Sequence, residues 1–296
     1  MAAEESARGS AETATGRRSL VLTLVVAIVL AIVYLLSAIA YGNGLDRVFV
    51  PPTAPPGGVA IALVPVKVDA DSQTSTTQVL VFPDAELLDG QGRLTETIQV
   101  DVYPAVADAT LFFEQGTVPS PQKVEVPALG FVQRYPFDHY RYSLEVTGLI
   151  LADAEPGGRT TPLPVELDLF FNVPGWTFSG STTNAGQSAS TATGEIGRSA
   201  PIVAIAVIFV SLILMFGCLA VITVVSGVRG RTDLGIAQAA WLTSATFALI
   251  ALRNAFPGDP PLGSWIDILV YFWTITAIML MIGLAVITTQ LRPNPR

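Results

Sequence analysis

Cysteine and histidine are almost absent from this sequence of 296 residues: Cys218 is the only cysteine and His139 is the only histidine. One cysteine cannot form a disulfide within the chain, so any folded domain must be stabilised by burial of apolar side chains. With a single histidine, the sequence offers too few residues for most hydrolase triads and histidine-ligated zinc sites. The sequence also has no phosphate-binding loop or dinucleotide fingerprint. We therefore expect no catalytic residues, no metal site and no cofactor, and predict that the protein is not an enzyme.

Charged residues are also scarce, at 14% of the sequence. The 24 acidic residues outnumber the 16 basic ones, which gives a formal net charge of −8. The domain between the first two long apolar runs is acidic, which disfavours nucleic acid and anionic lipid headgroups as partners. The long apolar runs carry no Asp, Glu or His at mid-depth, where a proton-coupled transporter would need them.

Long apolar runs, in contrast, occur four times, over residues 20–41, 200–227, 235–256 and 264–291. About 20 apolar residues, at ~1.5 Å rise per residue, cross the hydrocarbon core of a bilayer. We therefore predict four transmembrane helices, with the lipid bilayer as a partner of the chain.

The first run follows a polar segment. Residues 1–19 are polar and rich in small side chains, which predicts a disordered cytoplasmic tail. A cleaved signal peptide is the alternative, because Ala38-Ile39-Ala40 resembles a small-x-small cleavage site. The run is longer than the roughly 15-residue apolar region of a signal peptide, which favours an uncleaved anchor helix.

Basic residues beside the runs predict the orientation of the chain. Arg and Lys near helix ends stay on the cytoplasmic side, so Arg17 and Arg18 place the N-terminus inside. Four crossings then place residues 42–199 outside the cell and return the C-terminus to the cytoplasm. Arg198 and Arg253 lie near outer helix ends and are exceptions to the rule. We predict a multi-pass protein of the plasma membrane.

Residues 42–199 change to short alternating segments separated by turn residues. The expected strands are Val59–Val68, Thr76–Phe82, Leu94–Tyr103, Thr110–Phe113, Lys123–Val126, Tyr140–Leu151 and Val165–Val173. Strands at this spacing predict an antiparallel β-sandwich, so the fold class is an α+β membrane protein with an N-terminal anchor helix and a C-terminal three-helix block. The Gly-, Ser- and Thr-rich stretch 178–199 predicts a flexible return to the helices.

One acidic turn is a candidate cation site. Asp69 and Asp71 are two residues apart, and hard oxygens at that spacing can converge on calcium in a turn. The remaining ligand pattern of a calcium loop is missing, so we interpret this segment as a solvated turn.

A stripe of small residues runs along the segment 235–256. Ala240, Ser244 and Ala248 are spaced by four residues and share one face of a helix. In lipid, helices associate by close packing and interhelical hydrogen bonds, which small residues permit. We predict that this face packs against neighbouring helices and that the segment is central to the bundle.

The aromatic segment around Tyr135-Pro136-Phe137-Asp138 and Tyr140 is the most distinctive local sequence of the outer domain. Pro136 favours a turn, and Asp138 can accept hydrogen bonds from backbone amides two residues on. One interpretation is a tight turn whose aromatic residues form cross-strand pairs. The other is a coupling loop that rests against the outer helix ends or the lipid headgroups, where aromatic side chains prefer to lie.

Arg253 and Asp267 flank the predicted outer loop between the last two helices. A charge near the membrane interface either reaches out to water or forms an ion pair, and we predict that these two residues pair. The alternative is that Arg253 lines a path for a solute.

Two resemblances follow from these segments. Tyr135-Pro136-Phe137-Asp138, with Tyr140, is similar to the Phe-Pro-Phe-Asp-type turn of pentameric ligand-gated channels, where the turn belongs to the coupling surface between ligand domain and pore. Those channels have four helices after the β-domain, whereas this chain has three after it and one before. The whole layout, with the Arg253–Asp267 loop, resembles an actinobacterial and mycobacterial four-pass membrane-protein family known as domain of unknown function 4436. That resemblance implies no activity.

Two functions remain open at this stage. The first is a non-enzymatic protein of the cell envelope whose external β-domain binds a ligand or partner, such as another envelope protein or a second copy of the chain. The second is an oligomeric channel-like or transporter-accessory protein, in which the β-domain is coupled to the helices through Tyr135–Tyr140. The absence of catalytic residue sets favours the first, and the aromatic turn together with Arg253 favours the second.

Overall fold

The structure is a computed structural model that describes residues 48–107, 109–151, 160–184, 189–231 and 236–291, with scattered positions between 24 and 42. The predicted tail over residues 1–19 lies outside the described residues. Most of the predicted anchor helix over 20–41 lies outside them too, and the positions that are described there are helical. The chain divides into two units, Met1–Arg47 and Val48–Arg296, and the fold below is that of the second.

The described part of the second unit contains ten strands that form one large mixed β-sheet. They are β1 (Val59–Asp69), β2 (Thr74–Pro83), β3 (Thr97–Tyr103), β4 (Thr110–Phe113), β5 (Gln122–Gly130), β6 (His139–Leu151), β7 (Thr160–Leu163), β8 (Val165–Leu169), β9 (Trp176–Asn184) and β10 (Ala189–Arg198). The main path runs β4-β3-β6-β5-β2-β1-β8, and β10 joins β6 to β9. We call residues 59–198 the β-domain.

Strand β6 is the longest strand and pairs with β3, β5, β7 and β10. Its side chains alternate between buried and exposed from Tyr140 to Val146, as the two-residue period of a strand requires. Strand β5 pairs with β2 through Gln122–Pro127 and with β6 through Ala128–Gly130. It therefore links the strands on the β2 side of the sheet to those on the β6 side. Side chains from both sides of the sheet path pack in one hydrophobic core.

Two expectations about the β-domain are wrong. The pairing is not wholly antiparallel, because β8 lies parallel to β1 after a long crossover. The stretch 178–199 is not a flexible return, because β9 and β10 form a regular antiparallel hairpin there. Gly180 and Gly194 face each other in that hairpin, and the ring of Phe178 packs close to both.

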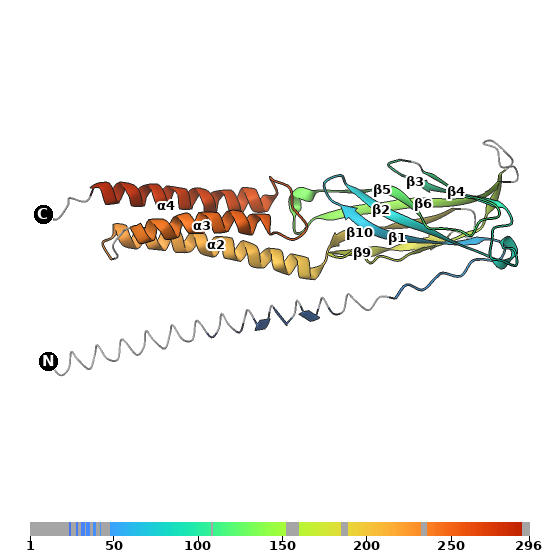
Figure 1. Ribbon diagram of the computed structural model, residues 1–296, viewed down its shortest axis with the longest axis horizontal. Coiled ribbons are helices and arrows are strands. Elements are labelled where there is room, and N and C mark those ends of the chain that lie inside the picture. Colours follow the sequence, from blue (N-terminus) through green and yellow to red (C-terminus); the bar gives the residue numbers. More distant parts are fainter. Residues whose placement is uncertain are drawn as a thin grey trace. The chain divides into compact units, whose positions relative to one another are not determined.

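Three helices follow the β-domain: α2 (Ala200–Val228), α3 (Ile236–Asn254) and α4 (Phe272–Leu291). A π-helical turn, η3 (Asp267–Tyr271), leads into α4. Among the described residues, these are the helices long and apolar enough to cross a membrane, with α4 counted together with its π-helical turn. They lie side by side, and α4 contacts both others (Figure 1).

The predicted packing stripe of α3 lies on the face that the other described helices leave uncovered, and its packing role stays a prediction. Ala240, Ser244 and Ala248 are all exposed, whereas α3 buries Leu242 and Leu249 with their neighbours on the opposite face. The Ser244 hydroxyl donates to Ala240 O of its own helix at 2.9 Å, so it needs no partner across an interface.

Candidate functional site

The β-domain joins the helices without a linker. Strand β10 ends at Arg198 and α2 begins at Ala200, so Ser199 alone separates them. The Ser199 N–H donates to the carbonyl of Gly175, just before β9, at 2.9 Å. The last strand therefore passes directly into the first helix of the bundle.

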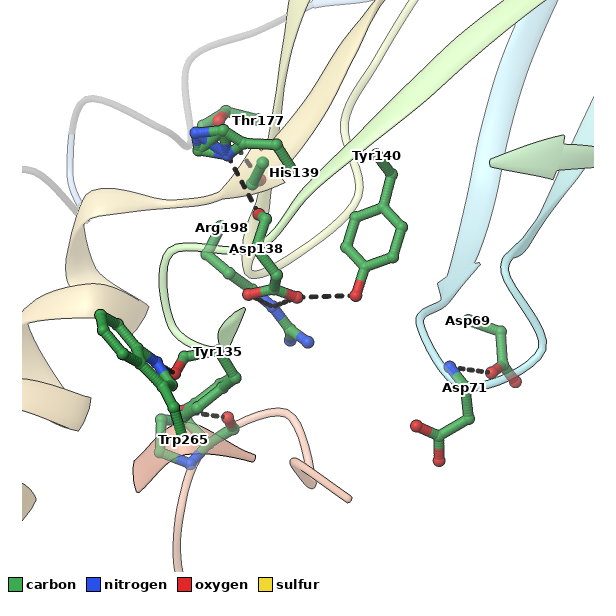
Figure 2. Close-up of polar contacts among 11 residues, drawn as sticks. Asp69, Asp71, Tyr135, Asp138, His139, Tyr140, Thr177, Arg198 and Trp265 are labelled. Atoms are coloured by element: carbon green, nitrogen blue, oxygen red, sulfur yellow. Dashed lines mark hydrogen bonds and ion pairs between the residues drawn. The ribbon is translucent and has the colours of Figure 1, made fainter. Parts of the chain in front are cut away.

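Arg198 forms a buried ion pair with Asp138 at this junction. Strands β10 and β6 are antiparallel and their register places Gly197 opposite His139, so Arg198 faces Asp138, the residue just before β6. Arg198 Nε donates to both carboxylate oxygens of Asp138, at 3.1 and 3.2 Å. The two side chains are 3% and 0% exposed. The Tyr140 hydroxyl adds a third bond to Asp138, at 2.8 Å, as Figure 2 shows.

Aromatic rings enclose the Arg198 guanidinium. Its carbon lies 3.9 Å from the centre of the Trp176 ring and 5.2 Å from that of Tyr135, both within range of cation–π attraction. Within the described part of the chain, Nη2 of Arg198 is buried and has no hydrogen-bond partner. A Cβ added at Gly258, in the α3–α4 loop, would lie 2.3 Å from Nη1. The guanidinium thus occupies a closely fitted space between the β-domain and that loop.

Tyr135 and its neighbours contact the α3–α4 loop directly. The Tyr135 hydroxyl donates to the carbonyl of Pro257 at 2.7 Å, and its own carbonyl accepts a hydrogen bond from Trp265 Nε1. The Tyr135 ring packs edge-on against Phe256, and Phe137 packs edge-on against Trp265. The turn around Pro136 therefore lies against the α3–α4 loop, while the Tyr140 hydroxyl donates to Asp138 (Figure 2).

Burial raises the pKa of the Tyr135 hydroxyl above its ordinary value, and the nearby Arg198 guanidinium opposes this shift. Burial likewise raises the pKa of Tyr140, and its hydrogen bond to Asp138 raises it further. Both phenols therefore stay protonated at physiological pH and act as hydrogen-bond donors.

Arg253 and Asp267 form a second ion pair, on the other side of the α3–α4 loop. Nη2 of Arg253 donates to Asp267 Oδ2 at 2.8 Å and to the carbonyl of Pro260 at 3.0 Å, and Nε donates to Oδ1. The same carboxylate accepts from the N–H of Gly263 at 3.0 Å and from the hydroxyl of Ser264. Arg253 is thus engaged within the loop, and its side chain is only 10% exposed. The arrangement closes the α3–α4 loop.

The carboxylate of Asp69 is bound by groups close to it in sequence. Asp69 Oδ1 accepts from the N–H groups of Asp71 and Ser72, at 3.2 and 3.1 Å, and Oδ2 pairs with Lys67 at 2.9 Å. The Lys67 ammonium and the Ser72 amide lower the Asp69 pKa from 3.8 to about 2. Among the residues that the structure describes, no group of His, Cys, Asp and Glu is placed to hold a metal ion.

Sequence reasoning missed Trp176 and did not assign a partner to Arg198. It expected Asp138 to bond backbone amides, whereas the carboxylate binds Arg198 and Tyr140. One signal was present: Arg198 is a basic residue at a helix end where basic residues are disfavoured. A partner carboxylate explains such an exception, although it lies 60 residues away in sequence.

These contacts define a class of protein in which a β-domain packs directly on a bundle of apolar helices. The chain belongs to the family described as Domain of unknown function (DUF4436), whose sequence model matches residues 49–196. Residues 198–292 match a second family, described as Domain of unknown function (DUF8686). A comparison with curated proteins gives no match. The match to the first family is confirmed, whereas the four-pass layout and the likeness to ligand-gated channels stay predictions. The two matched ranges meet at the junction that holds Arg198.

Proposed function

We propose that this protein is a non-enzymatic, four-pass protein of the plasma membrane whose β-domain is an external binding module. Both termini lie in the cytoplasm, and residues 42–199 form a β-sandwich outside the membrane. The apolar helices and the basic residues at the predicted cytoplasmic ends support this topology. The external module binds another protein of the cell envelope.

The observation that carries this proposal is the set of buried contacts at the junction between the β-domain and the helices. The Arg198–Asp138 pair fixes β10 at the start of α2, and the Tyr135–Trp265 contact fixes the aromatic turn on the α3–α4 loop. A domain held at several points presents the same face at a constant height above the bilayer. This suits recognition of a partner in a fixed position, since binding then orders little of the module itself.

A photo-crosslinking amino acid placed in the β-domain tests the binding role. Phe112 on the edge strand β4 is 52% exposed and suits the purpose, while Phe247, 69% exposed on α3, provides a control within the helices. We expect a discrete crosslinked protein from Phe112 in native membranes and none of the same mass from Phe247. A crosslinked species common to both positions would contradict recognition by the β-domain.

The alternative function is an oligomeric channel-like or transporter-accessory protein. It is favoured by the turn around Tyr135 and Phe137, which contacts the helix ends as the coupling turn of ligand-gated channels does. Four helices alone enclose no useful pore, so conduction requires several copies. Mass measurement of the purified protein in detergent separates the two functions: a pentamer favours the channel, and a monomer favours the binding module.

A further inference from the structure

The turn between β5 and β6, residues 131–137, exposes two aromatic rings. Phe131 and Phe137 are 64% and 51% exposed, whereas Val132 and Tyr135 between them are buried. A short 3₁₀ turn, η2 (Val132–Arg134), separates the two rings. Single exposed apolar side chains are common on protein surfaces, so exposure alone assigns nothing here. The place of these rings beside the helices is what gives them a meaning.

Phe137 lies against the helices within their membrane-spanning ranges. Its ring packs edge-on against Trp265, and it borders a small apolar hollow together with Val207 of α2 and Leu269 of η3. Val207 and Leu269 are 48% and 61% exposed and belong to helices long and apolar enough to cross a bilayer. The free side of Phe137 therefore has the same surroundings as these two side chains, and in a membrane those surroundings are lipid.

Phe131 is close to the same level. It comes just before η2, and Tyr135 follows η2 and accepts a hydrogen bond from Trp265 through its carbonyl. At the ~2.0 Å rise of a 3₁₀ helix, four residues place Phe131 about 8 Å from Tyr135 along the chain. The headgroup layer is roughly 5–8 Å thick on each side of a bilayer. Phe131 is thus within reach of that layer, and Figure 1 shows the turn at the end of the β-domain that adjoins the helices.

Arg134 places a positive charge on the same turn. Its guanidinium carbon lies 5.3 Å from the centre of the Phe131 ring, within the range of cation–π attraction. Among the residues that the structure describes, no carboxylate lies within ion-pair distance of Arg134. The planar guanidinium matches the geometry of phosphate oxygens. The ring and the charge together therefore match the two sides of a phospholipid interface, acyl chain below and phosphate above.

We propose that the β5–β6 turn enters the headgroup layer of the outer leaflet, where Phe131 contacts the upper acyl chains and Arg134 binds a phospholipid phosphate. The inference rests on the proposed membrane-spanning topology. A lipid is the occupant because the turn continues the surface that α2 and η3 present to the bilayer. The protein carries a net charge of −8, so the phosphate of a zwitterionic headgroup suits a single arginine better than an anionic headgroup does.

The first test measures the depth of a nitroxide on Phe131→Cys, in the full chain with Cys218→Ser, in phosphatidylcholine vesicles. Oxygen concentrates in the bilayer and a nickel chelate stays in water, so the ratio of their collision rates with the nitroxide reports depth. We expect a ratio severalfold higher at residue 131 than at Phe112→Cys. Phe112 is 52% exposed on β4 and level with Leu149, roughly 33 Å from the start of β6. Leu214→Cys, from a residue 48% exposed on α2, marks the bilayer interior.

Three results of this test would overturn the proposal. A ratio at residue 131 equal to that at residue 112 places the turn in water. Slow collision of the residue 131 nitroxide with both reagents means that protein covers the ring. A ratio at Leu214→Cys as low as that at Phe112→Cys overturns the membrane-spanning topology itself, which separates that failure from failure of the turn.

The second test measures the proximity of arginine to lipid phosphorus in the same vesicles. Solid-state NMR detects dipolar coupling between isotope-labelled guanidinium carbons and the phosphorus of the headgroups. Arg134→Gln should lower the coupled fraction of the arginine signal. Arg93→Gln is the matched control and should leave the fraction unchanged, because Arg93 is exposed before β3, at the end of the β-domain where β6 finishes. Equal fractions in the unaltered protein and both variants would overturn the phosphate contact.

Discussion

Arg198 and Asp138 are directly opposite each other where the β-domain meets the helices, with Arg198 Nε 3.1 Å from the nearer carboxylate oxygen. Both side chains are almost fully buried. Removing one partner leaves an uncompensated buried charge, which costs far more than loss of an exposed pair. This pair is therefore the most sensitive point of the junction.

Arg198→Met should lower the free energy of unfolding by about 3–5 kcal/mol, as for other broken buried pairs. Arg198→Lys keeps the charge but loses the planar group that stacks on Trp176, so its effect should be smaller but measurable. Thermal unfolding of the full chain in detergent measures both. Lys67→Met, which breaks the exposed pair with Asp69, should cost less than about 1 kcal/mol. Equal effects of Arg198→Met and Lys67→Met would contradict the importance of the buried pair.

The Arg253–Asp267 pair should show strong coupling in a double-mutant cycle. Arg253→Met and Asp267→Leu each leave a buried charge without its partner, so each single change should be severely destabilising. The double change removes both charges and should cost clearly less than the sum of the two. Thermal unfolding and membrane expression of the four proteins measure the coupling. Additive losses would show that the two residues act independently.

Trp265→Phe tests the contact between the aromatic turn and the α3–α4 loop. It keeps an aromatic ring against Phe137 but removes the hydrogen bond to the Tyr135 carbonyl, a loss of about 1 kcal/mol. Distances between spin labels on the β-domain and on α3 should become more widely distributed. Trp273→Phe is the control, because Trp273 is 69% exposed on α4. Distributions of the same width in all three proteins would argue against rigid docking.

Gly194→Ala tests why the β9–β10 hairpin contains paired glycines. The new Cβ would lie 2.5 Å from the Phe178 ring and 2.6 Å from the carbonyl oxygen of Ser179, so the strand or the ring must move. Overpacking of this kind costs about 1–3 kcal/mol. Gly90→Ala adds the same methyl group where no atom lies within 4 Å, and should be close to neutral. Equal melting temperatures of the two variants would mean that the hairpin has room to adjust.

The lowered pKa of Asp69 predicts a small contribution to stability that is lost in acid. Its pKa in the folded protein is lowered to about 2, chiefly by Lys67, from an ordinary value of 3.8. The stabilisation is therefore fully present above pH 3.8 and is lost as the pH falls through about 2. Asp69→Asn should be less stable than the unaltered protein by under about 1 kcal/mol at pH 6, and the difference should vanish near pH 2. A constant difference over this range would refute the assignment.

Much of the β-domain can be predicted from local sequence patterns, but the junction with the helices cannot. The alternation from Tyr140 to Val146 predicts β6 because a half-buried strand repeats every two residues. Strands β9 and β10 are not predicted in this way, since glycine gives a weak β signal until a ring such as that of Phe178 covers Gly180 and Gly194. Tertiary packing decides that segment.

The two ion pairs also differ in how far the sequence predicts them. Arg253 and Asp267 flank one short loop, so their proximity follows from the two helices that the loop joins. Arg198 and Asp138 meet only because β10 pairs with β6 in one particular register. A single sequence does not contain that register in any local signal, so the pairing of Arg198 comes from the structure alone.

The orientation of the β-domain is the central claim, and cysteine accessibility tests it most directly. Cys218 is the only cysteine, so Cys218→Ser provides a background in which Gln91→Cys or Arg229→Cys is the single thiol. Gln91 lies in an exposed turn of the β-domain, and Arg229 lies just after α2. A maleimide that does not cross membranes should label Gln91→Cys in intact cells, and Arg229→Cys only after permeabilisation. The reverse pattern would place the β-domain in the cytoplasm and contradict the account.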